Sequence, residues 1–206
     1  MKMRTLNVYK QVLLGAVGIA SFLCFSDPAG AQEKRGDRAD VAVMYSTLHA
    51  SNSNNGQSLW MQGGTAEGHV PFYKRGLSVA MSVEGFHASA NSSSTVPLDL
   101  LMFSAGPRYT VQLRPRFSMF GEALAGEAHG FHSLFAYPGE AANPANATTT
   151  SANALVIQAG GGADARLNRH LGVRIAQVQW VRTQLPNGVS NLQNNVRISS
   201  GLTWSF

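Results

Sequence analysis

Residues 195–206 (NVRISSGLTWSF) decide the fold of this chain, because their apolar and polar side chains alternate without a break. One face of the segment carries Val196, Ile198, Ser200, Leu202, Trp204 and Phe206. The other face carries Asn195, Arg197, Ser199, Gly201, Thr203 and Ser205. Successive side chains of a β-strand point to opposite faces. The segment is therefore predicted to be a strand with one apolar and one polar surface.

The same alternation recurs along the rest of the chain after residue 39. It is clear in residues 77–84, 101–112 and 155–168, and weaker in residues 40–48, 59–69, 116–127 and 170–182. With the last segment this predicts eight strands, and a tilted strand of ~9–11 residues crosses a bilayer. The faces of 59–69 stay unassigned because the segment is rich in glycine.

The segment 170–182 departs from strict alternation. Gln177 and Gln179 would fall on the apolar face defined by the residues before them. A β-bulge near Ala176 would restore the pattern by turning Val178 and Trp180 outward.

The predicted connections alternate in length. Residues 49–58, 87–97, 128–153 and 183–192 form long connections, whereas 70–75, 113–115 and 167–169 form short ones. Long loops at one end and tight turns at the other are typical of a transmembrane β-barrel. An even strand count places both ends of the barrel at the tight-turn, periplasmic end. Alternation alone would also fit a soluble lipocalin-like barrel with its apolar faces inward.

Charge and aromatic placement favour the membrane barrel. Seven charged residues share the polar faces, and we expect an interior network from them: Glu84, Arg108, Glu122, Asp164, Arg166, Arg174 and Arg197. Buried charges are costly unless paired, and the planar guanidinium of arginine matches a carboxylate. The aromatic residues expected at the two membrane interfaces are Trp60, Phe72, Tyr73, Tyr109, Phe117 and Trp180.

Composition excludes several classes of protein. Of 206 residues, 44% are hydrophobic and 13% charged, and a single Cys excludes both a disulfide framework and a Cys-based zinc site.

Residues 1–31 are predicted to be a signal peptide, with a basic start, an apolar run and the cleavage pattern Ala29-Gly30-Ala31. A lipoprotein signal at Cys24 is disfavoured because Leu23 precedes it. Residues 32–38 would form a short periplasmic segment and 39–206 the barrel.

The net charge argues weakly for any anionic partner. Cleavage after Ala31 would remove three basic residues and one acidic residue, which lowers the net charge from +5 to +3. We therefore expect no nucleic-acid partner. The long loops are rich in Ser, Asn, Thr, Ala and Gly, so the exposed end lacks a cationic patch that would bind lipid A phosphates strongly.

The whole of residues 39–206 resembles the OmpA/OmpX-like "outer membrane protein beta-barrel domain" family. The resemblance rests on 103–109 (FSAGPRY), 160–167 (GGGADARL), 171–174 (LGVR) and the final strand ending in Trp204 and Phe206. It implies an eight-stranded antiparallel up-and-down barrel in a bacterial outer membrane. Trp204 and Phe206 would then be the assembly signal, and the partners would be outer-membrane lipids, lipopolysaccharide and the assembly machinery. The peptidoglycan-binding domain of full-length OmpA is not part of the pattern.

The expected role is structural or surface-exposed, as a monomer with no cofactor, no metal and no catalysis. Adhesion or ligand contact would involve the 128–153 loop, which carries Phe131, Phe135 and Tyr137. A narrow channel is one alternative. A lipid A-modifying enzyme is another, with Ser133 as the nucleophile, His129 or His132 as the base and Glu127 or Glu140 as the orienting carboxylate. The Glu127–His132 cluster could also hold a metal loosely.

Overall fold

The computed structural model describes residues 38–51, 58–73, 76–88, 98–135, 149–186 and 191–206. These residues form eight strands: β1 (Asp40–Ser51), β2 (Ser58–Tyr73), β3 (Leu77–Ala88), β4 (Leu98–Arg114), β5 (Phe117–Phe135), β6 (Thr149–Arg166), β7 (Leu171–Thr183) and β8 (Gln193–Ser205). The expected signal peptide and residues 32–37 lie outside the described residues. Within the described part of the chain, no helix is long and apolar enough to cross a membrane.

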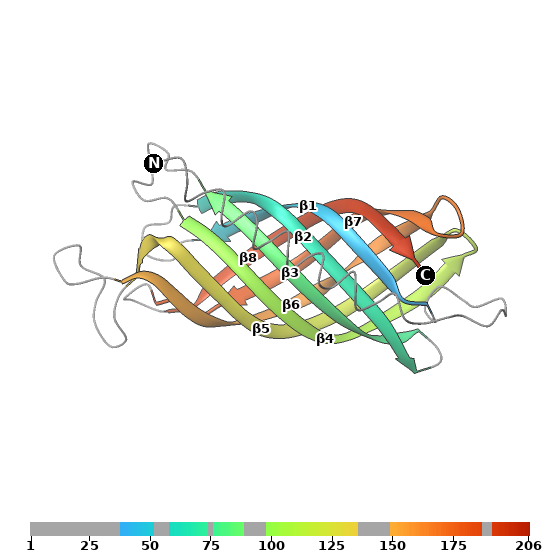
Figure 1. Cartoon of the computed structure of the whole chain (residues 1–206), viewed down its shortest axis with the longest axis horizontal. Helices are drawn as coiled ribbons and strands as arrows, with labels where there is room; N and C mark the ends of the chain where they lie inside the picture. The colour runs from blue at the N-terminus through green and yellow to red at the C-terminus, as the bar shows by residue number, and fades with distance from the viewer. Residues whose placement is uncertain (1–37, 52–57, 74–75, 89–97, 136–148, 187–190) are drawn as a thin grey trace.

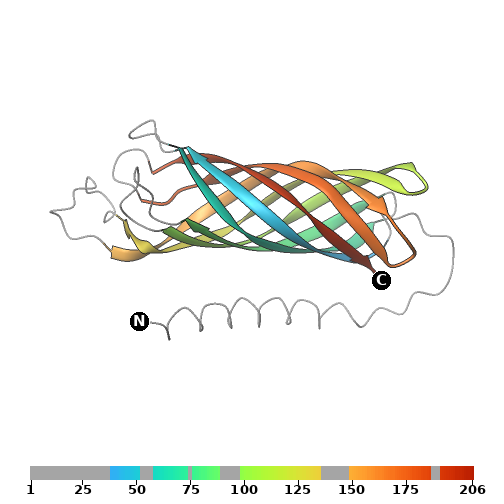
Figure 2. The same cartoon turned by 90° about the horizontal axis from the view of Figure 1, so that it is seen from above.

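The strands form a closed antiparallel barrel in chain order, which confirms the predicted fold class. Each strand pairs with its neighbours in sequence, and β1 also pairs with β8, so that Asp40 lies opposite Ser205. The backbone N–H of Phe206 donates to the Ala39 carbonyl at 3.0 Å. Figure 1 shows the strongly tilted strands and the chain end beside the start of β1, and Figure 2 shows the same elongated cylinder from above. Closure leaves no unpaired strand edge.

The outer surface of the barrel is apolar around its circumference. Every strand contributes exposed large side chains to it, for example Val43, Phe72, Met81, Phe103, Met119, Ile157, Val178 and Leu202. In β8, Leu202 is 57% exposed, whereas its neighbours Gly201 and Thr203 lie on the face of the strand that points into the barrel. Polar interior and apolar exterior are the polarity of a membrane barrel, and the reverse of a lipocalin.

The bulge in β7 lies where the alternation of the sequence breaks. The register of β7 against β6 and against β8 shifts between Arg174 and Gln177. As a result Gln177 and Gln179 are buried, whereas Val178 and Trp180 face outward. The extra residue therefore keeps two amides inside the barrel and two apolar side chains outside it.

Several connections are shorter than the sequence indicated, and two of them show the reason. The predicted loop 128–153 is wrong over much of its length, because β5 continues to Phe135 and β6 begins at Thr149. Similarly, β2 continues through the predicted turn to Tyr73, with Pro71 paired to Ser78 before a register shift. In both places backbone pairing extends the strand past residues whose side-chain pattern is weak, since main-chain hydrogen bonds do not depend on side-chain polarity.

The interior is not polar throughout. At the long-loop end it is filled by an apolar cluster, which the alternation did not predict: Leu48, Met61, Phe86, Ala88, Leu100, Met102, Ala128, Phe135, Val156, Val181 and Leu185. Most of the buried polar side chains lie in the rest of the barrel, toward the tight-turn end. The interior therefore has two layers with different chemistry.

Candidate functional site in the barrel interior

Three arginines from three strands lie inside the barrel and are almost completely shielded from solvent. Arg108 comes from β4, Arg174 from β7 and Arg197 from β8, and none is more than 1% exposed. Five buried carboxylates surround them: Asp40, Glu67, Glu84, Glu122 and Asp164. Removing such charges from water costs several kcal/mol per ion unless each is paired and hydrogen-bonded. The arrangement of the partners therefore decides whether this interior is stable.

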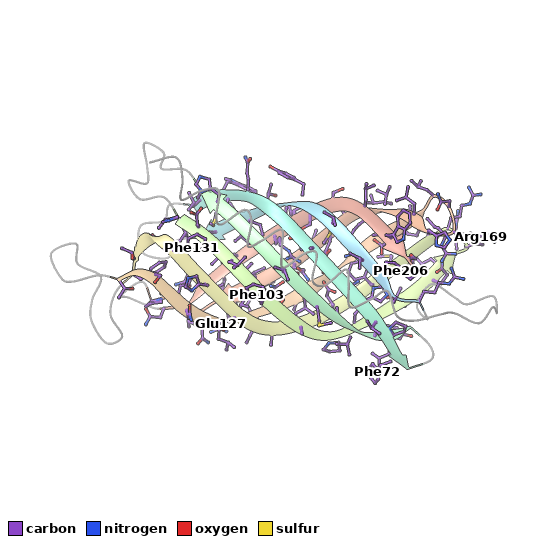
Figure 3. The ribbon with its side chains drawn as sticks, in the orientation of Figure 1. Phe72, Phe103, Glu127, Phe131, Arg169 and Phe206 are labelled. Carbon is purple, nitrogen blue, oxygen red and sulfur yellow. The ribbon has the colours of Figure 1, made fainter. Side chains whose placement is uncertain are left out.

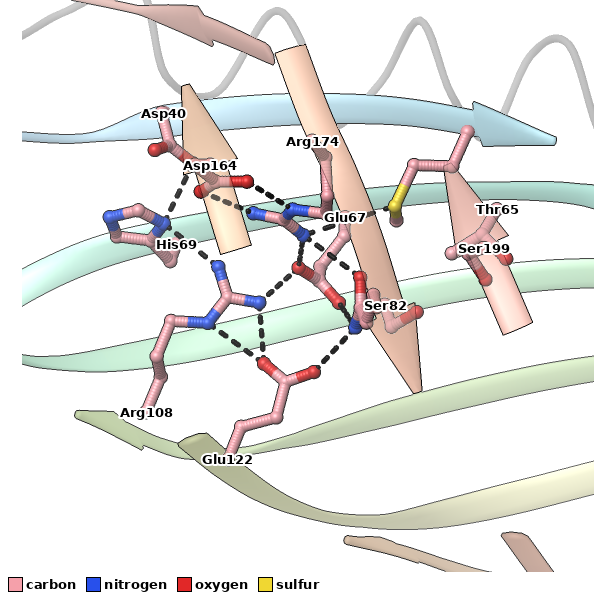
Figure 4. Close-up of polar contacts among 12 residues, drawn as sticks. Asp40, Thr65, Glu67, His69, Ser82, Arg108, Glu122, Asp164, Arg174 and Ser199 are labelled. Carbon is pink, nitrogen blue, oxygen red and sulfur yellow. Dashed lines mark hydrogen bonds and ion pairs between the residues drawn. The ribbon is translucent and has the colours of Figure 1, made fainter. Parts of the chain in front are cut away.

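Glu67 of β2 is the centre of the larger cluster. Its Oε1 forms an ion pair with both Arg108 and Arg174. Its Oε2 accepts a hydrogen bond from Gln177 Nε2 at 3.0 Å. Figure 4 shows this carboxylate between the two guanidinium groups. One side chain of β2 thus joins β4 and β7 across the interior of the barrel.

Arg108 also donates hydrogen bonds to a second carboxylate, that of Glu122. Its Nε and Nη2 donate to Glu122 Oε2 at 2.8 and 2.5 Å. The other oxygen of Glu122 accepts from Gln177 Nε2 at 2.7 Å and from Gln179. Both glutamines are inside because of the bulge in β7, so the bulge completes the hydrogen bonding of Glu122.

Arg174 binds Asp164 with two nitrogens. Its Nε donates to Oδ1 at 2.9 Å and its Nη2 to Oδ2 at 3.3 Å. Lysine offers no such planar fork. At the edge of the cluster, His69 Nδ1 lies 3.1 Å from Arg108 Nη1 and 2.7 Å from Asp40 Oδ1. The cluster therefore reaches β1 as well.

An aromatic ring supports both guanidinium groups. The centroid of Phe120 lies 4.0 Å from Arg108 Cζ and 4.4 Å from Arg174 Cζ. A guanidinium over an aromatic face is attracted by the ring quadrupole. A Cβ at Gly162 would come within 2.7 Å of this ring, so glycine in β6 makes the room that Phe120 occupies.

A smaller polar cluster lies next to the apolar layer. Glu84 of β3 forms an ion pair with Arg197 of β8. Glu84 Oε1 also accepts from Ser82 Oγ and Gln158 Nε2, both at 2.9 Å. Apart from the ion pair, the Arg197 guanidinium makes no hydrogen bond among the described residues. It is therefore the least satisfied of the three arginines.

The structure brings most of the predicted network residues together. Glu84, Arg108, Glu122, Asp164, Arg174 and Arg197 are buried, whereas Arg166 is half-buried at the end of β6. Its backbone N–H donates to the Arg116 carbonyl at 2.8 Å, which places it at the rim of the barrel.

Sequence reasoning missed three members of the cluster, namely Asp40, Glu67 and His69. Glu67 and His69 lie in the glycine-rich segment whose faces could not be assigned. The sequence does carry a signal, since Trp60, Val70 and Phe72 share the even positions whereas Thr65, Glu67 and His69 share the odd ones.

The predicted interface aromatics lie mostly on the outer surface. Trp60, Phe72, Tyr109, Trp180 and Trp204 are exposed, and Phe117 is half-buried. Tyr73 ends β2, but its side chain lies outside the described residues. Figure 3 shows Phe72 and Phe206 near one end of the barrel and Phe131 near the other.

The residues considered for catalysis do not form a triad in the described structure. His132 Nδ1 lies 2.6 Å from Asp99 Oδ2, and His129 contacts Asn153 Oδ1. Glu127 is exposed on the outer face of β5, and Glu140 lies outside the described residues. No group of three or more His, Cys, Asp or Glu among the described residues could hold a metal ion.

The interior clusters join strands that lie far apart in the sequence. Each carboxylate of the larger cluster contacts side chains from other strands, and the apolar cluster lies beyond it toward the long loops. An eight-stranded barrel is just wide enough for its own side chains. The arrangement can therefore lock strand register and close the interior.

The fold is similar to that of two solved structures. The crystal structure of Neisserial surface protein A (NspA) matches with a TM-score of 0.62 and 13% identity, over 82% of this chain and 97% of that one. Ail, the attachment invasion locus protein of Yersinia pestis, in complex with the heparin analogue sucrose octasulfate, matches with a TM-score of 0.52 and 13% identity, over 82% and 98%. No family model matches the chain, and no curated protein sequence matches it. The similarity shows the fold, that of the eight-stranded outer-membrane barrels.

Proposed function

We propose that this chain is an outer-membrane protein that holds its long-loop end at the cell surface on a closed, non-catalytic barrel. The observation that carries the proposal is the inverted polarity of the barrel. Leu202, Phe103 and the other exposed apolar side chains need a lipid environment, while eight charged side chains and His69 are buried inside. The periplasmic position of the tight turns and of both barrel ends belongs to the same proposal.

The names of the similar structures support a surface role. One is called a surface protein and the other an attachment invasion locus protein. In this chain the β5–β6 connection is the candidate for contact with a ligand, because both strands extend well beyond their neighbours. Phe131 lies near that end, where it stacks on His129 with ring centroids 5.7 Å apart.

The first test is electrophoresis of the protein from an outer-membrane fraction, unheated and boiled. A folded membrane barrel should resist SDS and shift its migration only after boiling. A protein recovered from the soluble periplasm with no such shift would contradict the proposal.

Planar-bilayer recording then separates a closed barrel from the narrow channel. We expect no discrete conductance steps, because ion clusters and the apolar layer fill the interior. Reproducible steps that change with Glu122→Gln or Arg197→Ala would favour the channel.

A further inference from the structure

Exposed arginines gather at the tight-turn end of the barrel. Arg114 ends β4, Arg116 lies in the turn to β5, and Arg169 lies in the turn from β6 to β7, and all three are exposed. Among the described residues none of them has an ion-pair partner. We call these three residues the arginine collar. Figure 3 shows Arg169 at the same end as Phe206.

The turns that carry the collar are tied to neighbouring strands by backbone hydrogen bonds. The Arg166 N–H donates to the Arg116 carbonyl at 2.8 Å, which joins the β4–β5 turn to the end of β6. On the other side, the Ser205 N–H donates to the His170 carbonyl at 2.7 Å, which joins the β6–β7 turn to β8. Strands β4 to β8 thus present the collar along a continuous part of the rim.

Acidic side chains do not neutralise this rim. Asp40 and Asp164 are the acids nearest to it among the described residues, and both are buried and face interior partners. The other described acids that are not buried, Asp99 and Glu127, lie in the half of the barrel next to the long loops. Within the described part of the chain, the exposed side-chain charge of the rim is therefore positive.

Apolar side chains are interleaved with the collar. Leu113 precedes Arg114 and is 53% exposed, and Leu167 in the other turn is 57% exposed. Trp204, also exposed, stacks on His170 with centroids 6.2 Å apart. Leucine and tryptophan next to arginine at the edge of an apolar belt match the boundary between acyl chains and headgroups.

We infer that the arginine collar binds the anionic headgroups of phospholipids in the leaflet on the tight-turn side. The inference rests on the proposed function, since it requires the barrel to span a bilayer. Arginine binds phosphate through parallel N–H donors, and basic residues at a membrane surface attract anionic lipid. The interleaved leucines favour lipid over the polar glycan of a cell wall, because they would stay unburied against a glycan.

The three tryptophans allow the inference to be tested at one end of the barrel. A variant with Trp60→Phe and Trp180→Phe keeps only Trp204, which lies beside the collar. A matched control with Trp180→Phe and Trp204→Phe keeps only Trp60, which lies near the long-loop end, paired with His49. Each is folded into vesicles containing brominated phosphatidylglycerol or brominated phosphatidylcholine, and the quenching of fluorescence measures which lipid lies next to the tryptophan.

For Trp204 we expect phosphatidylglycerol to be preferred by about fivefold at low salt, the effect of roughly one basic residue near the surface. The preference should vanish in about 0.5 M NaCl, where screening is strong. It should also vanish when Arg114, Arg116 and Arg169 are all replaced by Gln. The Trp60 control should show no preference.

Three results would overturn the inference. The first is the same lipid preference for Trp204 and Trp60. The second is a phosphatidylglycerol preference of Trp204 that survives the three Gln substitutions. The third is co-sedimentation with peptidoglycan that requires the three arginines, while the two brominated lipids quench Trp204 equally. Heat-dependent migration is measured on every sample. Its loss in the unsubstituted protein would instead contradict the proposed membrane barrel itself, so the two failures are distinguishable.

Discussion

At the scale of single residues, Glu67 is the side chain on which the interior depends most. It is 2% exposed and is shared by Arg108 and Arg174. Each arginine has a further carboxylate of its own, and among the described residues Glu67 is the carboxylate that both arginines share. Its removal would leave two guanidinium groups close together with less opposing charge.

Glu67→Gln should therefore lower the free energy of unfolding by about 3–5 kcal/mol, the range for breaking a buried pair. Urea unfolding in lipid vesicles, followed by tryptophan fluorescence, measures the change. Glu127→Gln is the matched control, because Glu127 lies on the outer face away from the buried arginines, and this substitution should not lower the free energy of unfolding. Equal effects of the two substitutions would show that Glu67 does not hold the cluster together.

At the scale of the strands, close approach of neighbouring backbones constrains several glycines. A Cβ at Gly126 of β5 would lie 1.9 Å from the Phe103 carbonyl oxygen and 2.6 Å from Ser104 Cα in β4. At Gly85 of β3 nothing lies within 4 Å of the same added atom. The two positions differ because Gly126 turns inward at the curved wall, whereas Gly85 faces outward.

Gly126→Ala should destabilise the barrel by about 1–3 kcal/mol, as overpacking does, because a backbone atom must move. Gly85→Ala should be nearly neutral. The fraction of heat-modifiable barrel after refolding over a urea series measures both. A Gly126→Ala barrel as stable as the Gly85→Ala barrel would contradict the close approach of β4 and β5.

The sequence predicts a strand and its two faces only where apolar and polar side chains alternate along it. In β8 every position alternates, and the structure follows the pattern residue by residue. In β2 the glycines carry no side chain to report a face, so Glu67 and His69 were missed. The ends of β5 and β6 could not be placed either, because backbone pairing continues where side-chain alternation fades.

At the scale of the whole molecule, the interior divides into an ion-paired layer and an apolar layer. The alternation predicts the first layer and not the second, although Met102 and Val156 of the second layer also face inward. Contacts between strands far apart in sequence create the apolar layer, and alternation within one strand does not report them. Phe135 belongs to it and is 5% exposed.

This division predicts how much of the β5–β6 connection can be removed. Replacing residues 136–148 with a short glycine-containing turn should leave stability nearly unchanged, because the apolar layer is intact. Extending the replacement to 134–150 also removes Phe135 and should cost about 3–5 kcal/mol, as for Phe→Ala in a core. Urea midpoints of the two variants compare them. Equal midpoints would show that the apolar layer does not stabilise the barrel.

The most direct test of the central claim is which face of β8 meets lipid. Spin labels are attached to single cysteines at Ile198, Leu202, Ser199 and Thr203, in a protein whose Cys24 is replaced by Ser, and collision with dissolved oxygen is measured in vesicles. The labels at Ile198 and Leu202 should collide frequently with oxygen, which concentrates in the bilayer, and those at Ser199 and Thr203 should be shielded. The reverse pattern would contradict the membrane barrel and indicate a soluble one with its apolar face inside.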